Sequence, residues 1–290
     1  KKILIYGLGK SGLSTFKFLN KKAKIYLFDD NLKKKFRHQA KQWISNIKEI
    51  SKKKFDVIII SPGIDILNCK LSKFLKKNES KIYTDLDIFY SFYKNKSITI
   101  TGTNGKSTTA KILYDILSDQ NYDCRLIGNI GNPALSEKKI TKKTVFVIEA
   151  SSYQLDYSQL FTSKYSAILN ISPDHIERHK NLKNYISAKF RLLDSQSRES
   201  IEFVKKNDVL INKKLNSKRY NPKIIKVDLK KANKIIKLIK NKYFLSAGTL
   251  ENLSFILKIS EKLNLNSKIL IKTLNRFKGL KYRQQIIYEN

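Results

Sequence analysis

The stretch Ser97–Thr109 places the strongest constraint on how this chain can fold. Isoleucine alternates with threonine from Ile98 to Thr101, and this pattern predicts a buried strand. The glycine-containing loop Gly102–Gly105 follows, and Lys106 then opens a segment whose apolar residues have helical spacing. Such an order favours a polyphosphate ligand, because free backbone N–H groups and the positive end of the helix face the anion. We therefore expect a nucleoside triphosphate at this loop.

The length of this loop departs from the usual phosphate-binding motif, Gly-x-x-x-x-Gly-Lys-Ser/Thr. Ile100 stands where that motif has its first glycine. In the usual motif the lysine neutralises the β- and γ-phosphates and the next hydroxyl binds Mg²⁺. Lys106 and Ser107 occupy those two positions here. An ordinary turn with a chance Gly-Lys pair is the alternative, but the order of strand, loop and helix favours the phosphate loop.

A second glycine motif, near the N-terminus, predicts a separate nucleotide-binding domain. A strand at Lys2–Tyr6 is followed by the glycine-rich run Gly7–Gly12 and a helix, and the next strand, Lys24–Phe28, ends at Asp29. This is the order of the dinucleotide-binding fingerprint. Further strands at 55–60 and 81–83 extend it to a small doubly wound α/β domain. The motif fits NAD, a flavin or any nucleoside diphosphate group, and an unliganded turn remains an alternative.

Beyond a polar linker at 91–96, a second α/β domain with a mostly parallel sheet is expected. Its predicted strands are 97–101, 125–127, 144–148, 165–169, 209–211 and 223–227, and its predicted helices include 185–193, 252–263 and 269–277. Glu149 and His175 follow two of these strands, so both should lie at the carboxyl edge of the sheet, beside the phosphate loop. Glu149 is a candidate Mg²⁺ ligand or a surface acid, and His175 a metal ligand, a substrate contact or a structural histidine. From composition alone, Lys189 is a solvated lysine.

Composition narrows the class of protein. The length of 290 residues predicts about two domains, and no apolar run approaches the roughly 18 residues that span a membrane. Two cysteines in separate segments predict no disulfide framework and favour the cytoplasm. A net charge of +35 raises nucleic-acid binding as an alternative. Only eight of the 59 basic residues are arginine, and the lysines are spread along the chain, which disfavours that alternative.

Together the motifs make this chain similar to the Mur ligases, the ATP-dependent amide-forming enzymes of peptidoglycan precursor synthesis. The motifs that carry the resemblance are Gly7–Ser14, Ser61–Ile64, Thr101–Thr108, Gly128–Gly131, Glu149–Leu155 and Asn170–Arg178. Within the family the set most resembles the members that add D-glutamate to UDP-N-acetylmuramoyl-L-alanine through an acyl phosphate. The alternatives are another Mur ligase or a folylpolyglutamate-type ligase and, in other classes, a nucleotide-dependent oxidoreductase or a basic nucleic-acid-binding protein.

The resemblance implies three domains. Residues 1–92 would form a small Rossmann-like domain for the UDP substrate, and residues 93–277 a central P-loop-type domain for ATP. Residues 278–290 would form the junction to a third domain that we expect to be missing, so that this fragment binds its UDP substrate and ATP but turns over negligibly alone. The resemblance further implies a cytoplasmic monomer with no membrane insertion and no specific nucleic-acid partner. ATP and Mg²⁺ would be required.

The resemblance also assigns site residues by position. The ATP-binding residues would be Gly102, Thr103, Asn104, Gly105, Lys106, Ser107, Thr108, Asn252 and Arg283. The substrate-binding residues would be Ser11, Asp29, Ser61, Pro62, Gly63, Asn129 and Ser151. One Mg²⁺ would be bound by Ser107 and Glu149, and a second by His175 and Lys189, with Lys189 as its N-carbamate. Catalysis would rest on Lys106, His175 and Lys189.

The sequence departs from the family pattern in three motifs. Thr249 stands where an adenine-side asparagine is expected, and Asn31 stands where an arginine should follow the uracil-side acid. The junction reads Lys281-Tyr282-Arg283 in place of Pro-His-Arg. These departures bear on nucleotide affinity and not on the family.

Overall fold

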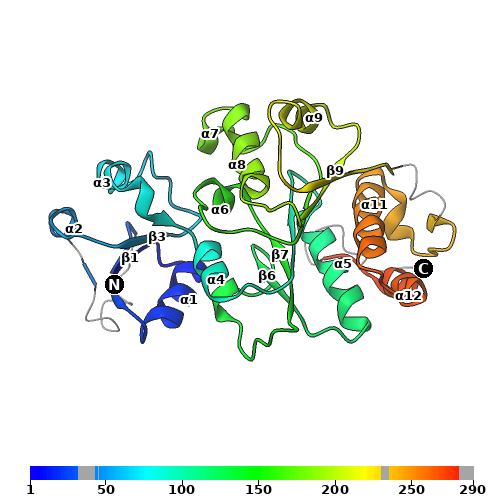
Figure 1. Ribbon diagram of the computed structural model, residues 1–290, viewed down its shortest axis with the longest axis horizontal. Helices are drawn as coiled ribbons and strands as arrows, with labels where there is room; N and C mark the ends of the chain where they lie inside the picture. The colour runs from blue at the N-terminus through cyan, green and yellow to red at the C-terminus, as the bar shows by residue number, and fades with distance from the viewer. Residues whose placement is uncertain (32–42, 45, 230–234, 281–290) are drawn as a thin grey trace. The chain divides into compact units, whose positions relative to one another are not determined.

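The computed structural model describes residues 1–31, 43–44, 46–229 and 235–280. It divides the chain into two compact units (Figure 1). The N-terminal unit comprises residues 1–94, 132–139 and 152–161, and the central unit comprises 95–131, 140–151 and the residues from 162 onward. Each unit holds one parallel sheet, which confirms the predicted α/β class. Within the described ranges, no helix has both the length and the apolar character needed to cross a bilayer.

The sheet of the N-terminal unit has the strand order β2-β1-β3-β4. Its strands are β1 (Lys2–Tyr6), β2 (Lys24–Phe28), β3 (Val57–Ile60) and β4 (Ile82–Tyr83). Along β1, Leu4 and Tyr6 enter one apolar core while Ile3 and Ile5 enter another. Strands that are apolar on both faces are typical of a sheet covered by helices on both sides. The helices of this unit are α1 (Lys10–Leu19), α2 (Ile47–Lys52), α3 (Ser72–Lys77), α4 (Asp85–Phe92) and α6 (Ser152–Asp156).

Asp87 explains why a segment late in the chain belongs to the N-terminal unit. This buried residue completes a capping box with Thr84 at the start of α4. Its Oδ1 atom also accepts hydrogen bonds from the Ser158 hydroxyl (2.7 Å) and from the backbone N–H groups of Leu160 (2.8 Å) and Phe161 (2.9 Å). Because a buried carboxylate is costly without several donors, these bonds fix the residues after α6 against α4.

The central unit is built on a sheet with the order β10-β9-β8-β5-β7-β6. Its strands are β5 (Ser97–Thr101), β6 (Cys124–Gly128), β7 (Val145–Glu149), β8 (Tyr165–Ile168), β9 (Ile201–Lys205) and β10 (Lys223–Val227). Its helices are α5 (Lys106–Asp119), α7 (Ile176–His179), α8 (Leu182–Asp194), α9 (Val209–Leu215), α11 (Ala247–Lys262) and α12 (Ser267–Arg276). The predicted phosphate loop therefore leaves β5, an interior strand of the sheet.

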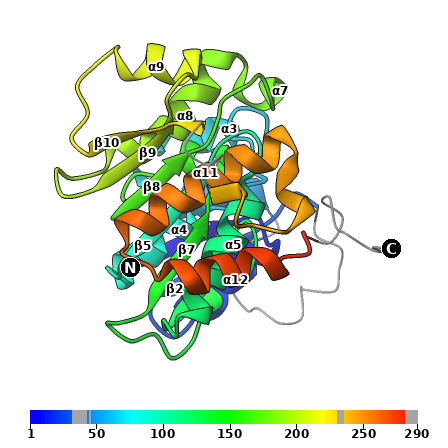
Figure 2. The same ribbon diagram turned by 90° about the vertical axis from the view of Figure 1, so that its right-hand side faces the viewer.

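Helices cover both faces of this sheet. On one face α5, α11 and α12 lie side by side (Figure 2), and Ile98 and Ile100 of β5 share a core with their apolar residues. On the other face Ile168 of β8 packs with Tyr185 and Phe190 of α8. Burial on both sides holds β5 in place, so the loop that follows it starts from a fixed position.

One strand prediction for the central unit is wrong, and one strand was not predicted. Residues 209–211, predicted as a strand, begin helix α9, because the Asp208 carboxylate accepts the Ile211 N–H (2.9 Å) and caps the helix. The strand lies earlier, at β9, which the sequence analysis did not predict. Glu202 interrupts the apolar pattern of β9, although the structure buries its side chain completely.

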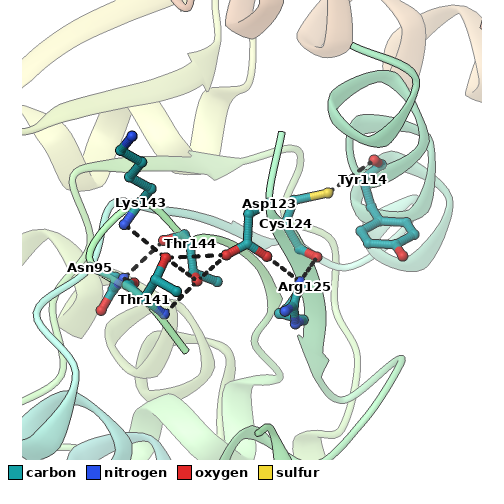
Figure 3. A network of polar contacts seen from close by, with 8 residues as sticks. All are labelled: Asn95, Tyr114, Asp123, Cys124, Arg125, Thr141, Lys143 and Thr144. Carbon is teal, nitrogen blue, oxygen red and sulfur yellow. Dashed lines mark hydrogen bonds and ion pairs between the residues drawn. The ribbon is translucent and has the colours of Figure 1, made fainter. Parts of the chain in front are cut away.

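A network of polar contacts connects the amino-terminal ends of three strands of the central unit (Figure 3). Asp123, directly before β6, accepts hydrogen bonds from Thr144 (2.5 Å) and Arg125 (2.5 Å). The side-chain amide of Asn95, two residues before β5, donates to the carbonyl groups of Thr141 (2.7 Å) and Thr144 (3.0 Å). These bonds satisfy loop groups at the edge of the sheet opposite the phosphate loop.

Candidate functional site

The predicted phosphate loop has the backbone geometry that its glycines permit. Gly102 has φ +147° and Gly105, the N-cap of α5, has φ +82°, conformations that side chains with a Cβ resist. A Cβ on Gly105 would lie 2.0 Å from Oδ1 of Asn252 on α11. This close approach needs glycine, and it brings Asn252, predicted to bind ATP, directly against the loop.

Threonine and lysine side chains brace the same loop from inside. Lys106 donates from Nζ to the Thr103 carbonyl at 2.7 Å. The Thr103 hydroxyl lies 3.0 Å from the hydroxyl of Tyr185 on α8 and accepts the Ser172 N–H at 3.0 Å. The loop is therefore fixed to helix α8 and to the segment that follows β8 before any ligand is considered.

A cavity of about 790 Å³ opens beside this loop. Of the predicted ATP-binding residues, it is lined by Thr103, Asn104, Gly105, Lys106, Thr108 and Asn252. Its other lining residues are Asn170, Ile171, Ser172, Lys205, Asp208, Gly248, Thr249 and Glu251. Lys205 and Asp208 were missed as site residues because they end or follow the unpredicted strand β9, whereas residues 170–172 follow the predicted strand β8 but were given no role. The ends of the parallel strands were the signal that could have found them.

Lys189 is the largest departure from what composition indicates. Its side chain is 1% exposed, and Nζ donates to the Gly102 carbonyl at 2.8 Å. Tyr185, one helical turn earlier on α8, places its ring centroid 4.5 Å from the same nitrogen. Burial, and secondarily the positive charge of Lys106, lowers the pKa of Lys189 well below its usual value. The interpretation of a solvated lysine is therefore wrong.

Glu149 ends β7 with a completely buried carboxylate. Its Oε1 atom accepts a hydrogen bond from the side-chain amide of Asn129 at 2.9 Å, so a predicted metal ligand and a predicted substrate contact touch. Its Oε2 atom is also buried and has no hydrogen bond in the described part of the chain. The interpretation of a surface acid is wrong, because the side chain is buried. A buried carboxylate oxygen without a hydrogen bond favours a cationic partner.

His175 stands at the N-cap of α7 with φ +53°. Its side chain is 44% exposed and lies 3.4 Å from the Asp174 carboxylate. Its ring centroid is 6.5 Å from that of Tyr185, so it lies near the helix that carries Lys189. Across the described residues, no three His, Cys, Asp or Glu side chains gather as a metal site. The metal-ligand role of His175 stays a prediction.

The glycine motif of the N-terminal unit is equally constrained. The Asp29 carboxylate accepts the N–H of Leu8 at 2.6 Å, and the Ser61 hydroxyl donates to the Gly7 carbonyl at 2.6 Å. A Cβ on Gly12 would lie 1.9 Å from that same carbonyl oxygen. Two of the predicted substrate contacts, Asp29 and Ser61, therefore touch the loop before α1, and a third, Ser11, lies in the first turn of that helix.

The remaining predicted residues lie as follows. Pro62 and Gly63 form the turn that closes with the Ile64 N–H donating to the Ser61 carbonyl at 3.0 Å. Ser151 follows β7 by two residues, in the central unit, and Ser107 is buried in the first turn of α5. Arg283, with the junction from residue 281, lies outside the described residues.

Comparison with known families now decides the affiliation. The profile of the Mur ligase middle domain matches residues 100–270, and that of the Mur ligase MurD-like N-terminal domain matches residues 1–82. The chain belongs to the Mur ligase family. The nonstandard phosphate loop thus lies within the matched domain of a family of ATP-dependent ligases. Membership of the chain in this family does not support the oxidoreductase or nucleic-acid-binding alternatives.

Individual Mur ligases resemble this chain along its length. A Rickettsia bellii protein named UDP-N-acetylmuramoylalanine--D-glutamate ligase is 32% identical over 98% of this chain and 68% of its own length. A Caldicellulosiruptor saccharolyticus protein of the same name is 30% identical over 100% of this chain and 70% of its own. A Neisseria meningitides ligase structure shares the fold with a TM-score of 0.63 at 13% identity, covering 97% of this chain and 99% of that one.

Proposed function

We propose that this protein is an ATP-dependent ligase that joins D-glutamate to UDP-N-acetylmuramoyl-L-alanine in the cytoplasmic synthesis of peptidoglycan precursors. The observation that carries the proposal is the phosphate loop: Gly105 and Asn252 meet at the mouth of a cavity large enough for a nucleotide. The choice of D-glutamate follows the Rickettsia bellii and Caldicellulosiruptor saccharolyticus relatives, which carry that activity in their names.

ATP would place its phosphates on the loop and its base toward α11. Lys106 and the positive start of α5 would neutralise the phosphates, and Asn252 and Thr249 lie where the rest of the nucleotide extends into the cavity. A Mur ligase of the same fold from Thermotoga maritima has been solved in complex with ADP. Thr249 hydrogen-bonds Ser246 at the start of α11, so its hydroxyl is already engaged where the family has an asparagine.

The residues present fit Mg²⁺, which prefers oxygen ligands. Glu149 offers a buried oxygen with no hydrogen bond in the described chain, and Ser107 offers a hydroxyl at the helix start. Ser107 and Glu149 would hold one Mg²⁺, and His175 and Lys189 would hold a second, with Lys189 as its N-carbamate. When bound, Mg²⁺ would offset the charge that accumulates on the phosphates.

The burial of Lys189 supports the carbamate. A lowered pKa leaves more of the amine neutral, and a neutral amine can add carbon dioxide and release a proton. The carbamate is an anion and is attracted to the nearby cation of Lys106. A charged ammonium at Lys189 would instead be repelled by Lys106. The local charge would then favour a metal between Lys189 and the phosphates.

The reaction would proceed in two steps. The alanine carboxylate of the UDP substrate attacks the γ-phosphorus of ATP, which forms an acyl phosphate and releases ADP. The amine of D-glutamate then attacks the acyl carbon, loses a proton and expels inorganic phosphate. Lys106 would stabilise the first transition state, because phosphoryl transfer depends chiefly on positioning and charge neutralisation. The UDP group would lie on the loop between β1 and α1 in the N-terminal unit, near Ser11, Asp29 and Ser61.

Calorimetric titration tests the ATP site. Lys106→Met should weaken binding of ATP with Mg²⁺ by at least about tenfold, since it removes a charged contact. Lys111→Met is the matched control, because Lys111 lies on the same helix and pairs with Asp115 at 2.6 Å. Equal ATP affinities for both variants would refute the assignment of the phosphate loop.

The UDP substrate is tested in the same way with three nucleotides. A D-glutamate-adding ligase should bind UDP-N-acetylmuramoyl-L-alanine more tightly than UDP-N-acetylmuramate or UDP-N-acetylmuramoyl-L-alanyl-D-glutamate. Preference for either of the other two would assign the chain to a different step of the family. Binding of NADH in place of all three would support the oxidoreductase alternative.

A further inference from the structure

We infer that Glu251 is a positioning residue for the phosphate loop and that Lys205 compensates its charge. The inference rests on the proposed ATP site and assigns roles to two lining residues outside the predicted set. Glu251 lies on α11 beside Asn252, and Lys205 is the last residue of β9. Both line the cavity beside the loop.

A continuous line of hydrogen bonds runs from Glu251 to the loop backbone. Oε1 of Glu251 accepts from Nδ2 of Asn170 at 2.6 Å, and Oδ1 of Asn170 accepts the N–H of Asn104 at 2.8 Å. Lys205 donates to the other oxygen, Oε2, also at 2.6 Å. The Glu251 side chain is 13% exposed and that of Lys205 is 26% exposed, so water screens this pair only in part.

The carboxylate decides which way the Asn170 amide faces. An asparagine amide offers an acceptor on one side and a donor on the other, and the two orientations have nearly the same shape. A carboxylate only accepts, so Glu251 requires the NH₂ group on its side. The carbonyl oxygen of Asn170 then accepts the N–H of Asn104 in the phosphate loop, and Nδ2 also donates to the Asn104 carbonyl at 3.4 Å.

Lys205 neutralises the negative charge that the Glu251 carboxylate brings to the cavity. An anion beside a polyphosphate would repel the ligand, and a partly buried anion without a partner is costly. The ion pair leaves Glu251 able to orient Asn170 while adding no net charge to the cavity. The two residues therefore act together, but of the pair only Glu251 orients the Asn170 amide.

Two explanations of Glu251 predict opposite effects of Glu251→Gln. If the residue contributed only charge, removing an anion would tighten the binding of ATP. Under the positioning role, the glutamine amide no longer selects one orientation of Asn170, so the Asn104 amide exchanges faster with solvent and ATP binds about tenfold more weakly. Lys205→Met should keep the slow exchange of Asn104 and weaken ATP binding alone, because the carboxylate stays in place without its partner.

The experiment measures hydrogen exchange of the Asn104 amide by NMR without nucleotide, and ATP affinity by calorimetry. Glu261→Gln is the matched control, since Glu261 pairs with Lys258 on the same helix at 2.7 Å in an exposed position. The double variant Asn170→Asp with Glu251→Gln exchanges donor and acceptor, and should restore the slow exchange of Asn104. It also supplies the decisive result if Glu251→Gln alone does not fold.

Unchanged exchange of Asn104 in Glu251→Gln, tighter ATP binding by that variant, or no recovery in the double variant would each overturn the inference. Failure of the proposed function looks different. In that case the wild-type protein would not bind ATP, while the exchange of Asn104 would still respond to Glu251→Gln and recover in the double variant.

Discussion

Glu202 should make the protein less stable as the pH rises from about 5 to 8. Its side chain is completely buried on β9, and burial raises its pKa from 4.5 to about 8. Hydrogen bonds from Ser166 and from the backbone at Ile168 oppose this rise without cancelling it. At neutral pH the folded protein therefore carries a protonated carboxyl group that the unfolded chain has already ionised.

The sign and size of the effect follow from proton linkage. Below pH 4.5 both states hold the proton, and above pH 8 neither does, so the free energy of unfolding falls only between these limits. Each pH unit in that window lowers it by up to about 1.4 kcal/mol, for a total on the order of 4 to 5 kcal/mol. Glu202→Gln has nearly the same shape, keeps an acceptor for Ser166 and does not titrate. The variant should therefore match the wild type near pH 4.5 and exceed its stability at pH 8.

Urea unfolding followed by circular dichroism at several pH values measures the difference. The single tryptophan, Trp43, lies outside the central unit, so its fluorescence follows the N-terminal unit and separates the two transitions. Glu199→Gln is the control, because the Glu199 side chain is 86% exposed and its removal should leave the pH dependence unchanged. Parallel curves for wild type and Glu202→Gln from pH 5 to 8 would refute the reasoning.

Two further changes test the loop and the opposite edge of the sheet. Gly105→Ala should weaken ATP binding at least about tenfold and destabilise the protein by roughly 1–2 kcal/mol, because the new Cβ meets Asn252 and φ is positive. Calorimetry measures the affinity and urea unfolding measures the stability. An unchanged ATP affinity would contradict the loop geometry. Asp123→Asn should cost about 1 kcal/mol at neutral pH. The hydrogen bond from Thr144, assisted by Arg125, lowers the pKa of Asp123. The stability that Asp123 contributes is therefore present above about pH 4 and lost in stronger acid. Equal urea midpoints for wild type and Asp123→Asn at pH 7 would contradict this prediction.

The parts of the site that are contiguous in sequence were predictable. Strand, loop and helix from β5 to α5 follow one another, so the spacing of Gly102, Gly105 and Lys106 was enough to place them. The glycine loop before α1 was predictable for the same reason, and Asp29 was identified because it directly follows the neighbouring parallel strand. Such motifs are recognisable because their strand, loop and helix are consecutive in the sequence and do not depend on distant parts of the chain.

The parts that depend on tertiary packing were not predictable. Strand β9 was missed because Glu202 breaks its apolar pattern, and a polar residue inside a strand indicates a solvent-facing side until the fold buries it. Because β9 was not predicted, Lys205 at its end was not identified as a site residue or as the ion-pair partner of Glu251. Residues 209–211 are three aliphatic residues in a row, and only the Asp208 cap, which uses a side chain before them, makes them helical.

Lys189 shows how a lysine-rich composition can hide a residue with an unusual environment. The chain has 51 lysines, so the residue type carries almost no information about any one of them. What distinguishes Lys189 is its environment: in the described ranges it is the lysine whose side chain is buried, and Gly102 of the phosphate loop accepts its hydrogen bond. Helix α8 buries it because Tyr185 and Lys189 lie one turn apart on the face toward the loop. A buried lysine beside a second cation is unfavourable unless its charge changes, and the proposed carbamate makes that change where a phosphate-bound metal needs an anion.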